Sequence, residues 1–184
     1  MHIQKTDFPG LLIITPRVFQ DERGFFTEFY NRKNFEQAGI YLDFVQDNHA
    51  LSKRKGVLRG LHLQVPPKAQ AKLVRVTRGA VFDVVVDLRK GSPSKGKWFG
   101  VTLSAENFRQ MLIPSGFAHG YQVLEPDTEF MYKVSEFYSP EHELGIYYAD
   151  PSLEIDWPLS APILSEKDKN LPGYIDFDSP FNMN

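Results

Sequence analysis

Three polar side chains stand at positions where the alternation of the chain directs them into an expected barrel. Tyr132 alternates with Phe130 and other apolar residues, and Lys72 and His62 stand among small and apolar neighbours in the same way. Period-two alternation places such residues on one face of a strand. A buried Lys, His or Tyr is costly unless it is paired or functional. A position at a strand end, in contact with water, would explain any one of these side chains alone. The three together, beside His119 and two arginines, favour a site for acid–base chemistry.

A second pattern has the spacing of a metal site. Residues 114–119 match Pro-x-Gly-x-x-His, one half of the cupin signature, and Gly56, five residues and His62 resemble the other half, Gly-x5-His-x-His. The second histidine of that half is Gln64, however, and no glutamate stands three or four residues later. A first-row metal needs imidazole and carboxylate ligands, and Lys72 would bring an ammonium group nearby. The pattern therefore predicts the barrel and a site without metal.

Two arginines lie next to glycines, in Arg23-Gly24 and Arg59-Gly60. A guanidinium fork matches the oxygens of a diphosphate, and glycine lets a ligand approach the backbone closely. Solvation at the surface is the usual explanation of a single arginine, so at this point both interpretations stay open.

Residues 91–97 begin like a phosphate-binding loop, Gly-x-x-x-x-Gly-Lys. Such a loop continues with Ser or Thr and opens a helix whose amides hold the phosphate. Here Trp98 follows, and an expected strand begins at that residue. We therefore expect a plain hairpin loop.

The elements that must position these side chains are short runs of aromatic and β-branched residues, separated by Gly, Pro, Asn and Asp. Turn signals recur about every 8–12 residues, which is typical of an antiparallel sandwich or barrel. Within one run, Phe82 and Val84 share one face while Asp83 and Asp87 share the other. The predicted strands are 11–19, 24–30, 44–50, 56–64, 71–78, 80–88, 98–104, 109–113, 118–124, 128–137 and 144–148.

Helical signals are few. Asn31 is a suitable N-cap for a helix over 32–38, and Ser165 can cap a second short helix. The segment from about Pro158 is rich in Pro, Asp and Ser, and we expect it to pack on a finished core. We find no linker that divides the chain, so residues 1–184 are predicted to form a single domain.

The composition limits the class of protein. The chain has 184 residues, of which 42% are hydrophobic and 24% charged, with a net charge of −2; this is enough for a core and excludes intrinsic disorder. The charge balance disfavours binding to nucleic acid or to an anionic membrane. The absence of cysteine excludes disulfides, thiolate zinc sites and cysteine nucleophiles. Because no run of about 18 apolar residues occurs, we expect a soluble cytoplasmic protein.

Ordered blocks over most of the chain make a family pattern. From about Phe8 to Asp168 the sequence resembles the dTDP-4-dehydrorhamnose 3,5-epimerases, enzymes of nucleotide-sugar metabolism. The resemblance implies an all-β fold, a cupin-type jelly-roll (double-stranded β-helix) barrel with antiparallel sheets and a few short peripheral helices. The blocks are Phe19-x-Asp21-x-Arg23-Gly24-Phe25-Phe26-x-Glu28, Phe44–Ala50, Val57–Gln64, Lys72–Val76, Phe82–Val84, Ile113–Gly120, Phe130–Lys133 and Leu164–Asp168.

The resemblance also implies a reaction. The family converts dTDP-4-dehydro-6-deoxy-D-glucose to dTDP-4-dehydro-L-rhamnose by inverting C3″ and C5″. Both carbons adjoin the C4″ ketone, so a base can remove their protons if the enolate oxygen is stabilised. By resemblance, His62 is the base and Asp168 the carboxylate that holds it. Lys72 faces the oxyanion, and Tyr132 returns a proton to the opposite face of the ring. No metal and no cofactor are implied.

A binding site for the dTDP part follows from the same resemblance, with a homodimer in which some N-terminal contacts come from the partner subunit. No nucleic-acid or membrane partner is implied. The binding residues are Arg23, Arg59 and Lys167 at the diphosphate or nucleotide, Glu28, Gln46 and Asn48 around the thymidine, Phe25 and Tyr138 as stacking partners of thymine, His119 near the sugar, and Glu143 at a late binding position.

Several alternatives stay open. Relatives that epimerise only C3″ or only C5″ keep the four catalytic residue types, so these residues do not separate single from double epimerisation. A sugar ketoisomerase on a related barrel is a further alternative. A cupin that only binds a nucleotide would lack His62 or Tyr132, and Gln64 disfavours a metal-dependent dioxygenase. The chain departs from the family pattern at Ala50, where His-Ser is more usual, and at Tyr148 and Ala149, where Trp-Asn precedes the aspartate; all three lie outside the four catalytic positions.

Overall fold

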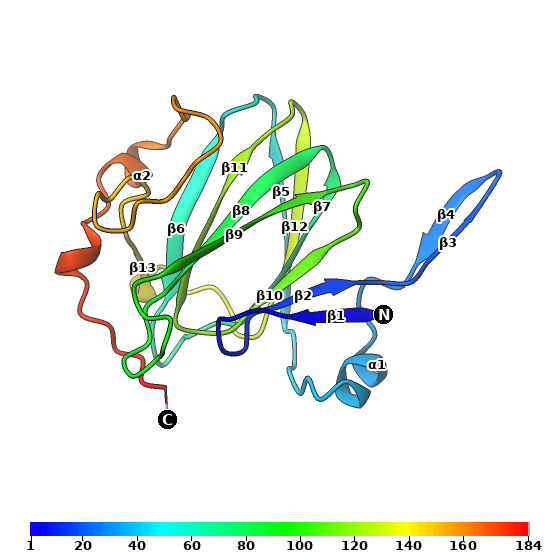
Figure 1. The fold of residues 1–184 in the computed structure, drawn as a ribbon, viewed down its shortest axis with the longest axis horizontal. Helices are drawn as coiled ribbons and strands as arrows, with labels where there is room; N and C mark the ends of the chain where they lie inside the picture. Colours follow the sequence, from blue (N-terminus) through cyan, green and yellow to red (C-terminus); the bar gives the residue numbers. More distant parts are fainter. Residues whose placement is uncertain (184) are drawn as a thin grey trace.

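Two antiparallel sheets lie face to face in the structure, a computed structural model that describes residues 1–183 (Figure 1). In spatial order, the larger sheet consists of β1 (His2–Lys5), β2 (Leu12–Thr15), β10 (Gln110–Ile113), β7 (Lys72–Arg78), β12 (Thr128–Val134) and β5 (Gln46–Ser52). The smaller sheet consists of β13 (Glu143–Gly145), β6 (Leu58–Gln64), β11 (Phe117–Val123), β8 (Ala80–Asp87) and β9 (Trp98–Ser104).

The main core fills the space between the two sheets. Val74 and Val76 of β7, Val85 of β8 and Phe130 of β12 are among its buried members. Such β-branched and aromatic side chains pack well on a pleated surface, which is why these runs form strands. Phe130 also borders a large cavity at this core, so the core provides an apolar wall for the polar groups described below.

Strand β8 is buried on both faces. Val84 and Val86 pack outside the barrel in a second core, together with Leu153 and other residues near the C-terminus. Asp83 and Asp87 lie on the opposite face and are both 0% exposed. The predicted alternation is confirmed, and its polar members are buried as fully as the apolar ones.

The helices are short. Helix α1 (Arg32–Gln37) begins after Asn31, whose side chain accepts a hydrogen bond from the Asn34 amide, and α2 (Glu166–Lys169) begins after Ser165 in the same way. Both predicted caps are confirmed, whereas the 3₁₀ turns η1 (Pro140–His142) and η2 (Tyr174–Asp176) were not predicted. Within residues 1–183, no helix combines the length and the apolar character needed to cross a membrane.

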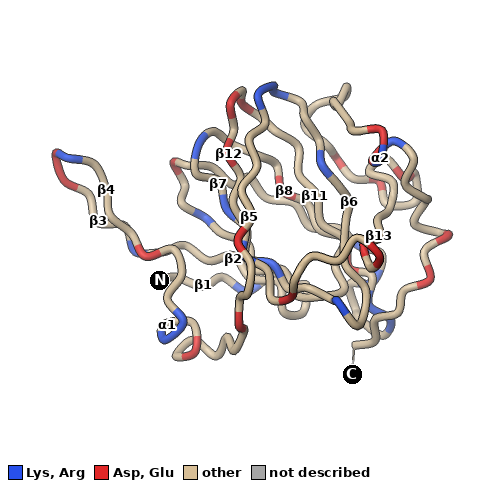
Figure 2. Tube along the Cα trace, turned by 180° about the vertical axis from the view of Figure 1, so that it is seen from behind, with Lys and Arg blue, Asp and Glu red and all other residues tan. Residues whose placement is uncertain are grey.

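The prediction of one strand over 11–19 was wrong. Strand β2 ends at Thr15, and β3 (Val18–Asp21) pairs instead with β4 (Gly24–Thr27) in a separate hairpin that projects from the barrel (Figure 1). Pro16 separates the two strands, because proline fixes φ and has no amide hydrogen to donate. Figure 2 shows an acidic and a basic segment together at the tip of this hairpin.

Other differences are smaller. Strands predicted over 24–30, 128–137 and 144–148 end earlier, at Thr27, Val134 and Gly145. Strand β1 was missed because Ile3 is its one apolar residue, which leaves no alternation to detect.

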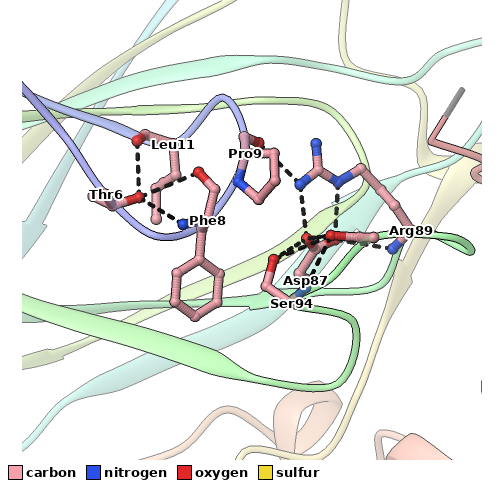
Figure 3. A network of polar contacts seen from close by, with 8 residues as sticks. Thr6, Phe8, Pro9, Leu11, Asp87, Arg89 and Ser94 are labelled. Atoms are coloured by element: carbon pink, nitrogen blue, oxygen red, sulfur yellow. Dashed lines mark hydrogen bonds and ion pairs between the residues drawn. The ribbon is translucent and has the colours of Figure 1, made fainter.

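The segment 91–97 is a hairpin loop between β8 and β9, as predicted. At its base the buried Asp87 carboxylate accepts hydrogen bonds from the Arg89 guanidinium and from the hydroxyls of Ser92 and Ser94. Arg89 also donates to the carbonyl of Pro9, 3.0 Å away (Figure 3). This network joins the N-terminal loop to the barrel.

The C-terminal segment contacts the smaller sheet. Ile163 forms a parallel bridge with Val57, and the Gln122 side chain binds both the amide and the carbonyl of Leu159. Near the end of the chain, Asn182 forms a second parallel bridge with Lys90. After Ile163 the chain enters α2, which lies beside β6.

Candidate active site

His62 and Asp168 form a hydrogen-bonded pair at the wall of the barrel. His62 lies on β6, and Asp168 lies in α2, where its backbone amide donates to the capping hydroxyl of Ser165. Nε2 of His62 is 2.6 Å from Oδ1 of Asp168, which is only 3% exposed. Burial alone would raise the pKa of Asp168, but the hydrogen bond and charge of His62, with the bond from Ser165, lower it below its usual range. The imidazole is thus held by an anionic carboxylate.

A second carboxylate lies on the other side of the ring. Glu143 is on β13, opposite Gln64 in the ladder with β6, and its Oε1 is 4.0 Å from Nδ1 of His62. Its Oε2 accepts a hydrogen bond of 2.8 Å from the Tyr138 hydroxyl and pairs with the Lys167 ammonium. Burial would raise the pKa of Glu143, but the bonds from Lys167 and Tyr138 and the charge of His62 lower it.

Lys72 and Tyr132 enter the site from the larger sheet, on the adjacent strands β7 and β12. Nζ of Lys72 is 3.4 Å from the backbone carbonyl of His62. Burial lowers the pKa of Lys72 to about 8, against the negative charges of Glu143 and Asp83, which favour the ammonium form. Burial raises the pKa of Tyr132, so its phenol is neutral at physiological pH.

His119 and Asp83 form a second histidine–carboxylate pair, on β11 and β8. His119 faces His62 across the ladder, and its Nε2 is 2.9 Å from Oδ1 of Asp83. Burial lowers the pKa of His119 and raises that of Asp83. Oδ2 of Asp83 is buried without a hydrogen-bond partner among the described residues. Sequence reasoning missed Asp83 as a site residue, because alternation showed only that it lies on the face opposite Val84 and not that this face is the interior one.

Two adjoining cavities meet at His62, Lys72 and Tyr132. One has a volume of about 420 Å³ and the other about 300 Å³, and these three residues line both. All but three of the predicted site residues line one or the other. The larger cavity adds Arg59, His119, Lys167 and Asp168, and the smaller adds Gln46, Asn48, Tyr138 and Glu143.

This arrangement can move protons to and from carbon. An imidazole held by a carboxylate is a general base. A buried ammonium can stabilise a developing oxyanion, because the surroundings screen its charge poorly. A neutral phenol can act as a general acid. All three groups line the same cavity.

The residue at the usual position of a metal ligand is used structurally. Nε2 of Gln64 donates to the carbonyls of Lys68 and Phe137, and its Oε1 accepts from the Ser139 amide. Over residues 1–183, we find no group of three or more His, Asp or Glu side chains arranged to hold a metal ion. A reaction without metal stays a prediction.

Comparisons with known proteins point in one direction. The family model for dTDP-4-dehydrorhamnose 3,5-epimerase matches residues 5–176. A Shigella flexneri dTDP-4-dehydrorhamnose 3,5-epimerase is 56% identical over 179 residues, covering 97% of this chain and 98% of the relative.

Solved structures agree with this. The epimerase of Legionella pneumophila, in complex with dTDP-4-keto-L-rhamnose, has a TM-score of 0.94 and 48% identity, covering 100% of this chain and 99% of that chain. The Bacillus anthracis enzyme, with TDP and pyrophosphate bound, has a TM-score of 0.92 and 50% identity, covering 94% and 98%.

The chain belongs to the dTDP-4-dehydrorhamnose 3,5-epimerase family. The predicted family resemblance and the cupin-type jelly-roll barrel are thereby confirmed. The structure, however, does not bring every predicted site residue of this epimerase to the cavity.

Three of them lie on or just after the projecting hairpin. Arg23 pairs with Asp21 at the exposed tip, Phe25 packs edge-on against Phe108, and Glu28 accepts a hydrogen bond from Asn31. None of the three lines either of the two cavities of this epimerase.

Tyr121 is another cavity residue of the epimerase that sequence reasoning missed. It stacks on Phe130 with 4.1 Å between ring centroids and lines the larger cavity. The only available signal was its place in a buried strand, where an aromatic residue is ordinarily part of the core.

Proposed function

We propose that this protein inverts C3″ and C5″ of dTDP-4-dehydro-6-deoxy-D-glucose, giving dTDP-4-dehydro-L-rhamnose for dTDP-L-rhamnose biosynthesis, by general acid–base catalysis through an enolate. The observation that carries the proposal is the His62 imidazole, which lies between Asp168 and Glu143 in the cavity that Lys72 and Tyr132 also line. The strong similarity to double epimerases supports the choice of substrate.

His62 acts as the base. It removes the proton from the carbon next to the ketone, and the imidazolium that forms is stabilised by the anionic Asp168. Its other nitrogen, Nδ1, is not hydrogen-bonded to Asp168 and lies on the side of Glu143. A well-placed general base accelerates such a reaction by about 10²–10⁴-fold.

Lys72 and Tyr132 complete the chemistry. The ammonium of Lys72 stabilises the C4″ enolate oxygen, and the neutral phenol of Tyr132 returns a proton from the opposite face of the sugar ring. Inversion needs two faces, because a single base would return the proton to the side from which it came. His119, kept in place by Asp83, contacts the sugar.

The dTDP part extends from the sugar along the cavities. Arg59 and Lys167, both in the larger cavity, bind the diphosphate. Gln46, Asn48 and Tyr138, in the smaller cavity, contact the nucleoside, and Glu143 holds Tyr138 and Lys167 together at its edge.

The active unit in this proposal is a cytoplasmic homodimer. Arg23, Phe25 and Glu28 line neither cavity of their own chain, and the hairpin exposes Phe19, Phe25 and Phe26 (50%, 56% and 67%). Exposed aromatic side chains at the end of a projecting arm favour insertion into another copy. The hairpin of one subunit thus supplies these contacts to its partner. We include no metal, cofactor, nucleic acid or membrane in the proposal.

Incubation with dTDP-4-dehydro-6-deoxyglucose in heavy water tests the function. Deuterium at both C3″ and C5″, with formation of the L-rhamno product in the NMR spectrum, is the expected result. Label at one carbon only would reassign the protein to the single epimerases. Bound nucleotide without any label would contradict catalysis.

A further inference from the structure

Three glutamine side chains bind the backbone of the segment after β12, residues 136–139. Gln64 binds the carbonyl of Phe137 at 3.2 Å and the amide of Ser139 at 2.6 Å. Gln70 donates to the carbonyl of Glu136 at 2.6 Å, and Gln46 accepts from the amide of Tyr138 at 3.1 Å. We call these residues the glutamine clamp.

The other contacts of the segment are local or partly exposed: Lys68 pairs with Glu136, the Phe137 amide donates to the Glu136 carboxylate, and the Ser139 hydroxyl binds His142. Phe137 and Tyr138 are 59% and 53% exposed, so apolar packing contributes little there. Strand β12 ends before the segment, at Val134, and the ladder of β13 begins after it, at Glu143. Backbone amides and carbonyls beyond a sheet must find other partners or water. The clamp supplies those partners from three different parts of the barrel.

What the segment carries is the Tyr138 hydroxyl. It donates to Oε2 of Glu143 at 2.8 Å, while Oε1 of the same carboxylate is 4.0 Å from the His62 ring. Gln64 is itself 4% exposed and lies two residues after His62 on β6, opposite Glu143 in the β13 ladder. One strand therefore holds both the imidazole and the centre of the clamp.

We propose that Gln64, assisted by Gln70, is a positioning residue that fixes residues 136–139 so that Tyr138 holds the Glu143 carboxylate beside His62 and near Lys72. The inference rests on the proposed function. Gln64 stands at the position of a metal ligand in the cupin pattern. Its side-chain amide binds backbone groups there, whereas an imidazole at this position would bind a cation.

The test compares Gln64→Met with a matched control. Gln122 is equally buried, at 0% exposure, and its side chain also bridges a backbone amide and carbonyl, those of Leu159, but it lines neither cavity. Gln64→Met should lower kcat/KM about tenfold or more, since small displacements in a site cost up to about 10²-fold. It should also move the alkaline limb of the pH profile to lower pH, because a displaced Glu143 supports the Lys72 ammonium less.

Gln122→Met should lose comparable thermal stability while keeping wild-type kcat/KM and the wild-type pH profile. Combining Gln64→Met with Tyr138→Phe should cost less than the product of the single effects, because both changes break the same chain of contacts. Where Gln64→Met does not fold, Gln70→Met, which removes one bond at a partly exposed position, takes its place in both measurements.

A Gln64 or Gln70 variant with wild-type kinetics and pH profile would overturn the inference, as would effects that multiply fully with Tyr138→Phe. Failure of the proposed function would give a different result from failure of this inference. In that case the wild-type protein itself would show no solvent exchange at C3″ or C5″.

Discussion

His62 and His119 face each other on β6 and β11, and each imidazole binds a carboxylate from another element through Nε2. Their surroundings differ. His119 is 7% exposed, and burial, the largest effect, lowers its pKa, so the ring is neutral at physiological pH. The Asp168 carboxylate at His62 is held anionic by its hydrogen bonds. Of the two rings, His62 is the one that has the surroundings of a base.

Loss of either member of the His62–Asp168 pair should strongly reduce proton exchange. His62→Ala or Asp168→Ala should lower deuterium incorporation into the substrate by about 10²–10⁴-fold, because the base or its orienting carboxylate is lost. The exchange rate measured by NMR in heavy water gives the answer. His49→Ala is the matched control, since His49 pairs with Glu129 at 3.1 Å without lining either cavity. Retained exchange in the Asp168 variant would remove the dyad from the mechanism.

Tyr132→Phe should separate exchange from inversion. The base can still remove protons in this variant, so solvent label should enter the substrate. Without the phenol no proton is delivered to the opposite face, and the L-rhamno product should form slowly. Tyr30→Phe, altered at a ring that packs with α1 on the outer face, should behave like the wild type. Wild-type turnover in Tyr132→Phe would assign the acid to another residue.

The pH profile should show the titration of Lys72. Its pKa of about 8 means that the ammonium is lost as pH rises through 8, and kcat/KM should fall with it. The effect of Lys72 on folding stability changes with pH in the opposite direction to its effect on activity. Between about pH 8 and its unfolded value of 10.5, the unfolded chain binds more protons, so this group favours the folded state increasingly as pH rises. A loss of activity just above pH 8 therefore reflects loss of the ammonium in the site, because deprotonation of Lys72 does not destabilise the folded state.

Two variants sharpen this prediction. Lys72→Met should lower kcat by about 10²–10³-fold at pH 7, the usual cost of one oxyanion donor. Glu143→Gln removes a negative charge that favours the ammonium, so its alkaline limb should lie below that of the wild type. An unchanged limb in Glu143→Gln would show that another group controls the profile.

How far the sequence could predict this site depends on the kind of position. Alternation reports the face of a strand, so it placed Tyr132 and Lys72 correctly on the interior side. It could not connect His62 with Asp168, because the carboxylate arrives through a short helix 106 residues later. That pair came from the family resemblance. The backbone contacts of Gln64 were beyond reach, because they depend on where an irregular segment runs.

Arg89 should matter for stability and little for catalysis. Arg89→Met leaves the buried Asp87 carboxylate without its cation, which typically costs about 3–5 kcal/mol. Thermal unfolding should show the loss, and activity per folded molecule should stay near that of the wild type. Lys133→Met is the control, because its partner Asp47 is 60% exposed and such surface pairs contribute about 0–1 kcal/mol. Equal melting temperatures for the two variants would contradict a structural role of the Asp87 network.

Exchange of the hairpin between subunits can be tested by mixing two inactive variants. In a dimer of Arg23→Ala and His62→Ala subunits, the cavity with an intact His62 would receive its hairpin from the subunit with an intact Arg23. Co-expression, or unfolding and refolding of the mixture, should therefore restore activity above that of either variant alone. If Arg23 acts in its own chain, every site of the mixed dimer lacks one of the two residues and no activity returns. A mixture of Lys72→Met and His62→Ala is the control, because both residues line one cavity and no pairing can rebuild it.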